Sequence, residues 1–194
     1  MRVLVACEFS GVVRRAFWRH GHVAWSCDLL EAEDRGVNHY QMGVHYVIEN
    51  YGPWDMMIAH PPCTHLACSG ARWFIDRQEE QKAAIEFFLY LAEANIPKIA
   101  IENPIGIMST RYRKPDQIIQ PWMFGHPESK GTCLWLKGLP ALAPTENVRE
   151  QMMKLPKAEA NRIHYASPGP NRWKERSRTY EGIADAMAEQ WGTR

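Results

Sequence analysis

Short apolar segments that alternate with segments of helical character are the feature that most constrains the fold of this chain. Nearly continuous apolar runs are typical of strands buried on both faces of a parallel sheet. Alternation of such strands with helices predicts an open, doubly wound α/β sheet with helices on both faces. The expected strands are RVLVAC (2–7), HVAWSCDLL (22–30), WDMMIA (54–59) and KIAIENP (98–104), and the expected helices are residues 12–21, 44–51 and 76–94.

The length of the chain suits a single domain made of two parts. A chain of 194 residues can bury one well-formed core. We expect residues 1–107 to form the core that carries the chemistry, and residues 108–194 to supply loops, a late strand and a C-terminal helix. Outside the segments above we predict a loop at 31–43, a strand at 132–138 (TCLWLKG), a helix at 146–160, a loop-like segment at 164–180 and a closing helix at 182–191.

Charge is distributed unevenly along the chain. The net charge is +1, but residues 1–107 hold 9 Lys and Arg against 13 Asp and Glu, whereas residues 108–194 hold 14 against 9. A basic half is suited to binding a polyanion, although an ordinary solvated surface gives the same composition. The charge pattern therefore permits a nucleic-acid partner without requiring one.

The cysteine count and the hydropathy pattern indicate the compartment. Five cysteines are an odd number, which argues against a disulfide framework and favours a reducing compartment. No apolar run reaches the ~18 residues that a membrane span requires, and the N-terminus leads directly into a strand. We expect a cytoplasmic protein with no membrane partner.

The most informative residues follow the predicted strands directly. In open α/β sheets, ligands bind beyond the carboxyl ends of the strands. Residues that are far apart in the sequence should therefore converge on one crevice. These residues are FSG (9–11), Asp28, PPC (61–63) and ENP (102–104).

Cys63 has three interpretations. It could be an ordinary half-buried thiol, or it could bind zinc together with His60, His65 and Cys68. Four ligands within nine residues are unusual, because structural zinc sites commonly pair two separated clusters. The third interpretation is a nucleophile: two prolines stiffen the loop, and cations or backbone N–H groups would lower the thiol pKa. We favour the nucleophile and expect no metal.

Glu102 ends a neighbouring apolar strand. Desolvation there is expected to raise the pKa of its carboxyl and let it give or share a proton. A strand-end glutamate by itself is often only a loop or capping residue. Together with Cys63 on the adjacent strand end, however, we interpret it as half of a catalytic pair.

PPC (61–63), ENP (102–104), FSG (9–11) and Asp28, in this order, resemble the DNA cytosine-5 methyltransferases, in particular short phage-type forms without a large target-recognition domain. The resemblance implies a Rossmann-like sheet, S-adenosylmethionine (SAM) as the methyl donor and DNA as the partner. It also implies that Cys63 adds to C6 of cytosine while Glu102 holds N3. Cytosine C5 is a poor nucleophile until a group adds at C6, so these two residue types suit the chemistry.

The resemblance also implies roles for further residues. Asp28 would accept the ribose hydroxyls of the cofactor, Gly11 would allow close approach of the backbone, and Phe9 and Pro62 would border the cofactor. We therefore expect a cofactor site formed by Phe9, Ser10, Gly11, Asp28 and Pro62. We expect a substrate site formed by Asn103, Pro104, Arg111, Arg113, Lys130, Thr132, Arg176 and Arg178.

Some positions differ from the family pattern. Cys7 stands where the family has an acid, and Glu8 is the candidate to replace that acid. Gly43 stands at the end of a third strand, where the family often has another acid. A pair of arginines that steadies the base is replaced by Lys130 and Thr132. Val13 and Arg14 replace two glycines, and Thr64 replaces a glutamine.

Two alternatives stay open. HPPC also resembles the prolyl motif of methyltransferases that act on amino groups, cytosine N4 or adenine N6, although those enzymes use no covalent cysteine. A non-catalytic protein that binds SAM or nucleic acid could use the basic and aromatic segment 171–180. For the cytosine-5 interpretation we expect single-stranded or weakly paired cytosine to be preferred, because extruding a paired base costs energy.

Overall fold

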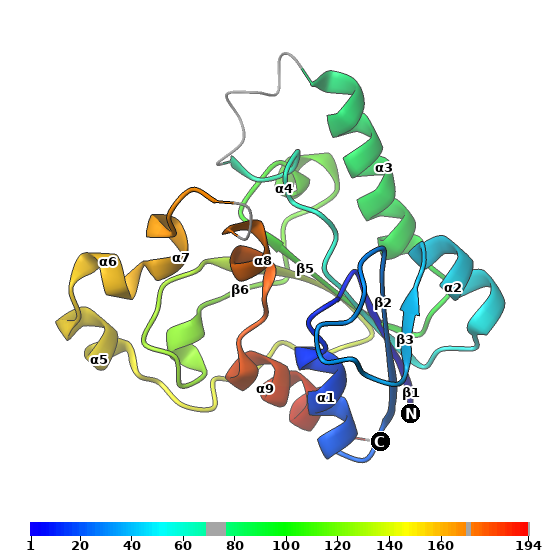
Figure 1. The fold of residues 1–194 in the computed structure, drawn as a ribbon, viewed down its shortest axis with the longest axis horizontal. Coiled ribbons are helices and arrows are strands. Elements are labelled where there is room, and N and C mark those ends of the chain that lie inside the picture. Colours follow the sequence, from blue (N-terminus) through cyan, green and yellow to red (C-terminus); the bar gives the residue numbers. More distant parts are fainter. Residues whose placement is uncertain (69–76, 170–171, 194) are drawn as a thin grey trace.

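The computed structural model describes residues 1–68, 77–169 and 172–193, which form one seven-stranded sheet in the order β3-β2-β1-β4-β5-β7-β6, with helices around it (Figure 1). The strands from β1 to β5 run parallel, and β7 runs antiparallel to both β5 and β6. The strand bounds are β1 (Arg2–Ala6), β2 (Val23–Asp28), β3 (His39–Gln41), β4 (Met56–Ala59), β5 (Lys98–Pro104), β6 (Gln117–Ile119) and β7 (Thr132–Lys137).

Helices cover both faces of the sheet, as the sequence predicts. Val3 and Val5 of β1 pack in one apolar core with residues of α1 (Val12–Arg19) and α9 (Glu181–Trp191), which lie side by side in Figure 1. Leu4 and Ala6 of the same strand pack in a second core with α2 (Val44–Tyr51) and α3 (Gln78–Glu93). Burial on both faces explains why the strands read as continuous apolar runs.

Several short elements differ from the prediction. The expected loop 31–43 contains β3, and β6 adds a second strand to the C-terminal part. Both strands span three residues, which is too short for a recognisable pattern; they form because a longer neighbour supplies their hydrogen-bond partners. The expected loop at 164–180 was wrong as well, because it contains the second half of α7 (Arg162–Tyr165) and all of α8 (Arg172–Ser177).

Other predicted segments agree more closely. The helix expected at 146–160 is broken into α5 (Arg149–Lys154) and α6 (Lys157–Ala160) at Pro156. The short helices α4 (Met108–Arg111) and η2 (Pro121–Met123) complete the set of named elements in the C-terminal part. Residue 76 of the long predicted helix and residue 171 of the basic segment lie outside the described residues. None of the described helices combines the length and apolar character needed to cross a lipid bilayer.

The strand register determines where the chemistry is placed. Ala59 of β4 pairs with Ile101 of β5, so the next residues of the two parallel strands, His60 and Glu102, emerge side by side. Thr132, the first residue of β7, pairs with Pro104 at the same edge. The two predicted motifs therefore converge at the carboxyl edge of the sheet.

Candidate active site

A buried histidine–glutamate pair lies at this edge. The Nδ1 atom of His60 is 3.2 Å from Oε2 of Glu102, and their side chains are 11% and 12% exposed. Thr179, which is buried just before α9, donates a longer hydrogen bond of 3.5 Å from Oγ1 to the same carboxylate oxygen. Glu102 is therefore held by groups from two other parts of the chain.

The pKa of Glu102 differs from the expectation. Burial by itself would raise this pKa, but the hydrogen bond and charge of His60, together with Lys130 and Thr179, outweigh burial and lower it. Burial would likewise lower the pKa of His60, yet Glu102 and the more distant Glu8 raise it. The prediction of a raised Glu102 pKa was wrong because it omitted the histidine on the adjacent strand.

Backbone and side-chain hydrogen bonds fix the loop that carries Cys63. Asn103 donates from Nδ2 to the carbonyl oxygen of Pro61 across 2.9 Å, which ties the PPC and ENP motifs together. The carbonyl oxygen of Cys63 accepts hydrogen bonds from the N–H groups of Leu66 and Ala67 at 3.0 and 2.9 Å. These bonds fold residues 61–67 into a compact turn and tie it to β5.

Gly106 allows this turn to lie against the segment that follows β5. The N–H group of Ile107 donates to the carbonyl oxygen of Leu66 at 2.9 Å, and Ala67 forms an isolated bridge with Gly106. A Cβ atom at position 106 would lie 2.0 Å from that carbonyl oxygen, so only glycine permits the approach.

Cys63 is exposed, but its thiol is less acidic than expected. Protein packed around the thiol removes water from it, which raises its pKa; Glu102 raises it further, while Arg176 and Lys130 lower it. The net shift is upward. The prediction of a lowered pKa was therefore wrong for this structure, because desolvation outweighs the two cations.

Four of the expected substrate residues gather near Cys63 and Glu102. Lys130 and Arg176 lie close enough to Cys63 to influence its pKa, and Lys130 also donates from Nζ to the carbonyl oxygen of Arg178 at 3.4 Å. Arg178 forms an ion pair with Glu33 at 2.6 Å. Thr132 is buried, and its hydroxyl donates to the carbonyl oxygen of Lys130 at 3.1 Å. Thr132 thus supports Lys130 rather than replacing a second cation.

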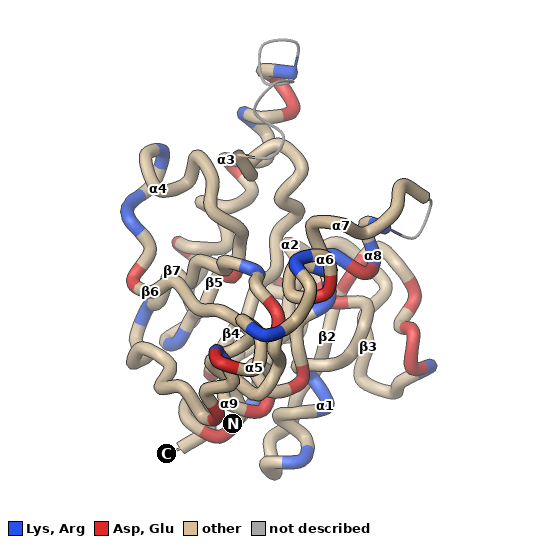
Figure 2. Tube along the Cα trace, turned by 90° about the vertical axis from the view of Figure 1, so that its left-hand side faces the viewer, with Lys and Arg blue, Asp and Glu red and all other residues tan. Residues whose placement is uncertain are grey.

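The two remaining arginines are placed differently. Arg111 is exposed at the end of α4. Arg113 forms an ion pair with Asp116 at 2.7 Å and donates to the carbonyl oxygen of Leu136 at 3.0 Å. Because Leu136 pairs with Ala100, near the start of β5, Arg113 is not brought together with Cys63. Figure 2 shows that blue and red segments alternate over the α6–α8 region, so positive charge does not form one continuous face.

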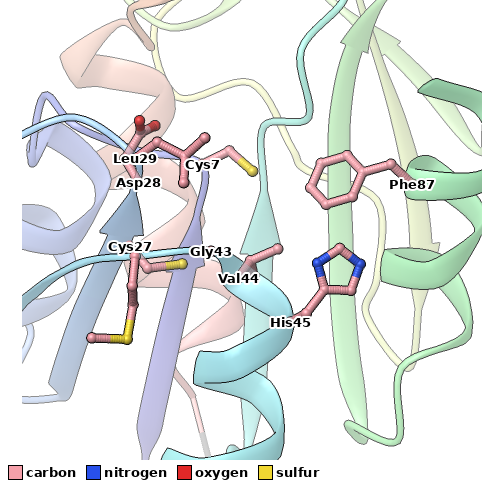
Figure 3. Close-up of a pocket in the computed structure, with 9 residues that line it drawn as sticks. Cys7, Cys27, Asp28, Leu29, Gly43, Val44, His45 and Phe87 are labelled. Carbon is pink, nitrogen blue, oxygen red and sulfur yellow. The ribbon is translucent and has the colours of Figure 1, made fainter. Parts of the chain in front are cut away.

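A pocket of about 240 Å³ opens beyond the ends of β1, β2 and β3 (Figure 3). Asp28 and Leu29 lie on one side of it, and His45 and Phe87 lie on the other. Oδ1 of Asp28 accepts a hydrogen bond from the N–H group of Leu30 at 2.9 Å, which orients the carboxylate. The remaining lining residues are Cys7, Cys27, Met42, Gly43 and Val44.

Asp28 thus lines the pocket, in agreement with its predicted position at a strand end. Phe9, Ser10, Gly11 and Pro62 are not among the lining residues, and their contact with a cofactor stays a prediction. Burial raises the pKa of the Cys27 thiol to about 12, so this thiol lines the pocket in its uncharged form at physiological pH.

Glu8 and the FSG turn have a structural role in this chain. The buried carboxylate of Glu8 accepts hydrogen bonds from the N–H groups of Val13 at 2.7 Å and Arg14 at 3.3 Å, and so caps α1. Gly11 has a φ of 69°, and a Cβ atom there would lie 2.5 Å from Oδ2 of Asp34. The positive φ favours glycine at this position, because L side chains rarely adopt that backbone conformation.

Phe9 lies beneath the basic and aromatic segment. It is 7% exposed, with its ring 5.7 Å from the ring of Trp173 and 5.8 Å from Nζ of Lys174, both in α8. The C-terminal part therefore reaches back over the first strand end and closes that side of the crevice. Sequence reasoning did not anticipate this contact, nor the contact of Thr179 with Glu102, because both join residues more than seventy positions apart.

Two buried polar atoms at the site have no hydrogen-bond partner among the described residues. They are Nε2 of His60 and Oδ1 of Asn103. Buried polar atoms without partners are uncommon and are often completed by a ligand or water. Nowhere in the described ranges do three or more His, Cys, Asp or Glu side chains converge in a way that could hold a metal ion.

The sheet order, the antiparallel β7 and the helices on both faces define a Rossmann-like fold. The chain is similar to a solved structure described as a DNA modification methyltransferase encoded within a prophage of E. coli, with a TM-score of 0.52 and 16% identity over 81% of this chain and 56% of that chain. It is also similar to the Dnmt2 methyltransferase of S. pombe, with a TM-score of 0.48 and 14% identity over 99% of this chain and 65% of that chain.

This chain spans less than two thirds of the length of either neighbour. At these identities the similarity concerns the fold. No family model and no curated protein sequence matches the chain.

Proposed function

We propose that this chain is a SAM-dependent methyltransferase that acts on C5 of cytosine in DNA, with Cys63 as the nucleophile and Glu102 as the group that engages N3. The observation that carries the proposal is the joining of the two motifs: Asn103 binds Pro61, and Cys63 and Glu102 share one carboxyl edge of the sheet. A soft nucleophile and a proton-bearing group on the same crevice are what addition to a pyrimidine ring requires.

The pocket beside this crevice fits part of the proposed cofactor. Pockets that enclose a whole drug-sized ligand usually measure ~300 to 1,000 Å³, so about 240 Å³ suits the nucleoside portion. Asp28 would accept hydrogen bonds from the two ribose hydroxyls, and the apolar side chains of Leu29, Val44 and Phe87 would contact the adenine. SAM supplies an electrophilic methyl group when it is bound.

The chain's own residues account for the rest of the chemistry. The thiolate of Cys63 adds to C6, and the electron pair that is displaced moves onto N3, where Glu102 supplies a proton. C5 thereby gains nucleophilic character. After C5 has been alkylated, N3 returns its proton to Glu102, and loss of the C5 proton to water restores the C5–C6 double bond and expels the thiolate.

The two cations near Cys63 suit a DNA substrate. Lys130 and Arg176 lower the thiol pKa, which favours the thiolate, and they can also contact a phosphate. The neighbour encoded within a prophage is described as a DNA modification enzyme, which agrees with this substrate. The small size of the C-terminal elements favours single-stranded or weakly paired cytosine.

Product analysis tests the proposal directly. The protein is incubated with SAM labelled in the methyl group and with a cytosine-containing oligonucleotide, and the digested nucleosides are separated. We expect label in 5-methylcytosine. Label in N4-methylcytosine or N6-methyladenine would establish the amino-group alternative, and binding of SAM without any transfer would establish the non-catalytic alternative.

A further inference from the structure

We propose that His60 is a positioning residue that shares one proton with Glu102 and supplies the proton that Glu102 passes to N3 of the base. This inference rests on the proposed function for its catalytic meaning. The shared proton itself is a property of the protein and can be tested without a substrate.

The geometry of the pair supports a shared proton. Nδ1 of His60 and Oε2 of Glu102 are 3.2 Å apart, within the range of a hydrogen bond, and both side chains are nearly buried. The register of β4 and β5 fixes this distance, because the two residues directly follow the paired residues Ala59 and Ile101. A proton between the two atoms can therefore be held by either group without movement of the backbone.

The groups that face the pair favour retaining one proton. The negative charges of Glu102 and of the buried Glu8 raise the pKa of His60, while the positive charge of Lys130 lowers it. Lys130 and Thr179 lower the pKa of Glu102, and Glu102 lies close enough to Cys63 to raise the pKa of the thiol. Two acidic groups facing one imidazole raise its pKa, which favours the protonated form of the pair.

The shared proton resolves a conflict in the site. Beside His60, Glu102 has a lowered pKa and carries no proton of its own at neutral pH, yet the cytosine ring needs one at N3 when the C6–S bond forms. In the pair, the proton moves from Nδ1 of His60 to Oε2 of Glu102, and Glu102 passes that same proton to N3, which leaves His60 neutral and Glu102 ionised. When the thiolate is expelled, N3 returns the proton and the pair regains its starting charge.

A titration of the protein without substrate tests the pair itself. The imidazole signals of His60 are followed by NMR against pH in the wild type, in Glu102→Gln and in His65→Gln, which is a matched control in the same loop. We expect the His60 pKa to fall in Glu102→Gln and to stay raised in His65→Gln. An unchanged His60 pKa in Glu102→Gln would overturn the proposal, whether or not the protein transfers methyl groups.

A pH profile then tests the catalytic role. His60→Asn keeps an N–H group near the position of Nδ1 but cannot store a proton, whereas His60→Ala removes both. We expect His60→Asn to approach the wild-type kcat at low pH, where Glu102 itself is protonated, and to lose more than tenfold at the higher pH at which Glu102 is ionised but the wild-type imidazole still holds its proton. We expect His60→Ala to be impaired throughout, with the KM for SAM unchanged in both variants.

If kcat falls with rising pH in the same way in the wild type and in His60→Asn, then His60 has only a structural role and the proposal is wrong. Methyl transfer to an amino group, together with a normal NMR titration, would instead contradict the proposed function while leaving the shared proton established.

Discussion

Asn103 holds Pro61 through one buried hydrogen bond of 2.9 Å, and this bond joins the loop that carries Cys63 to the strand that carries Glu102. Asn103 is 3% exposed. Leaving a buried carbonyl oxygen without its hydrogen-bond donor costs ~1 to 3 kcal/mol of folding stability. The two candidate catalytic residues therefore depend on a side chain that lies between them in the fold but that would not itself react.

Asn103→Ala should lower the free energy of unfolding by ~1 to 3 kcal/mol and also reduce kcat, because the Cys63 loop loses its anchor. Chemical denaturation and methyl-transfer kinetics measure the two effects. Asn50→Ala is the control, since Asn50 donates a comparable hydrogen bond to Tyr46 at an exposed site. Equal losses of stability in the two variants would contradict this account.

Cys63→Ala should abolish methyl transfer while SAM still binds. The reason is that no other group in the proposed scheme adds to C6. Cys68→Ala is a matched control, because Cys68 is also exposed and lies only five residues away. An oligonucleotide containing 5-fluorocytosine should form a covalent adduct with Cys63, detectable by mass spectrometry of the peptide; an adduct on Cys68 would identify a different nucleophile.

Asp28→Ala should weaken SAM binding by roughly ten- to a hundredfold, because a charge-assisted hydrogen bond to a ribose hydroxyl contributes ~1.5 to 3 kcal/mol. Isothermal titration calorimetry with SAM measures the change. Asp55→Ala is a suitable control, since Asp55 accepts its hydrogen bond from Arg2 at the opposite end of the strands. Unchanged affinity in Asp28→Ala would exclude the assignment.

The sequence predicts those parts of the fold that depend on local pattern. The strands β1, β2, β4 and β5 each carry an apolar run because residues on both of their faces are buried, so their ends, and the residues that follow them, could be located from the sequence. The three-residue strands β3 and β6 form through pairing with a neighbour, and a pattern of three residues carries no such information.

The electrostatics of the candidate site could not be predicted from the same pattern. The pKa of Glu102 depends on His60, and their contact follows from the relative register of two strands rather than from either strand alone. Thr179 contacts Glu102 from 77 residues away. Cys63 lies near two cations, as expected, but the direction of its pKa shift is decided by how much water the surrounding chain removes.

Acid should destabilise the protein by breaking the ion pair between Arg14 and Asp34. Arg14 is fully buried and forms an ion pair with Asp34, whose pKa is lowered to about 2 despite partial burial. A lowered folded-state pKa contributes stability that is present above the unfolded value and is lost as pH falls through the folded value. Asp34→Asn should therefore cost about 1 kcal/mol at neutral pH, less than the full shift because solvent screens the carboxylate, and the difference should become small near pH 2.

Thermal unfolding between pH 2 and pH 7 measures this difference. Asp185→Asn is the control, because Asp185 pairs with Arg19 at an exposed position, where ion pairs contribute little. A stability difference for Asp34→Asn that does not depend on pH would contradict the assigned cause.

Sequence selectivity should be low, with a recognition site of at most two or three bases. About forty residues lie between Gly138 and Tyr180, and they form short helices of four to six residues rather than a separate domain. Side chains from such elements mainly contact phosphates, which position a strand without reading its sequence. Each cation that contacts a phosphate adds to the salt dependence of binding, by ~0.7 in the logarithmic slope for single strands.

Lys130→Gln and Arg176→Gln should each weaken DNA binding and reduce the salt slope, and the loss should be similar for all sequences. Lys137→Gln should change neither, because Lys137 lies at the other end of β7 from Thr132 and binds the carbonyl oxygen of Ala94. Bisulfite-type mapping of methylation on random DNA, with single-stranded and duplex substrates compared, measures selectivity directly. Modification confined to one site of four or more specified bases would mean that these short elements read sequence, and the argument from their size would fail.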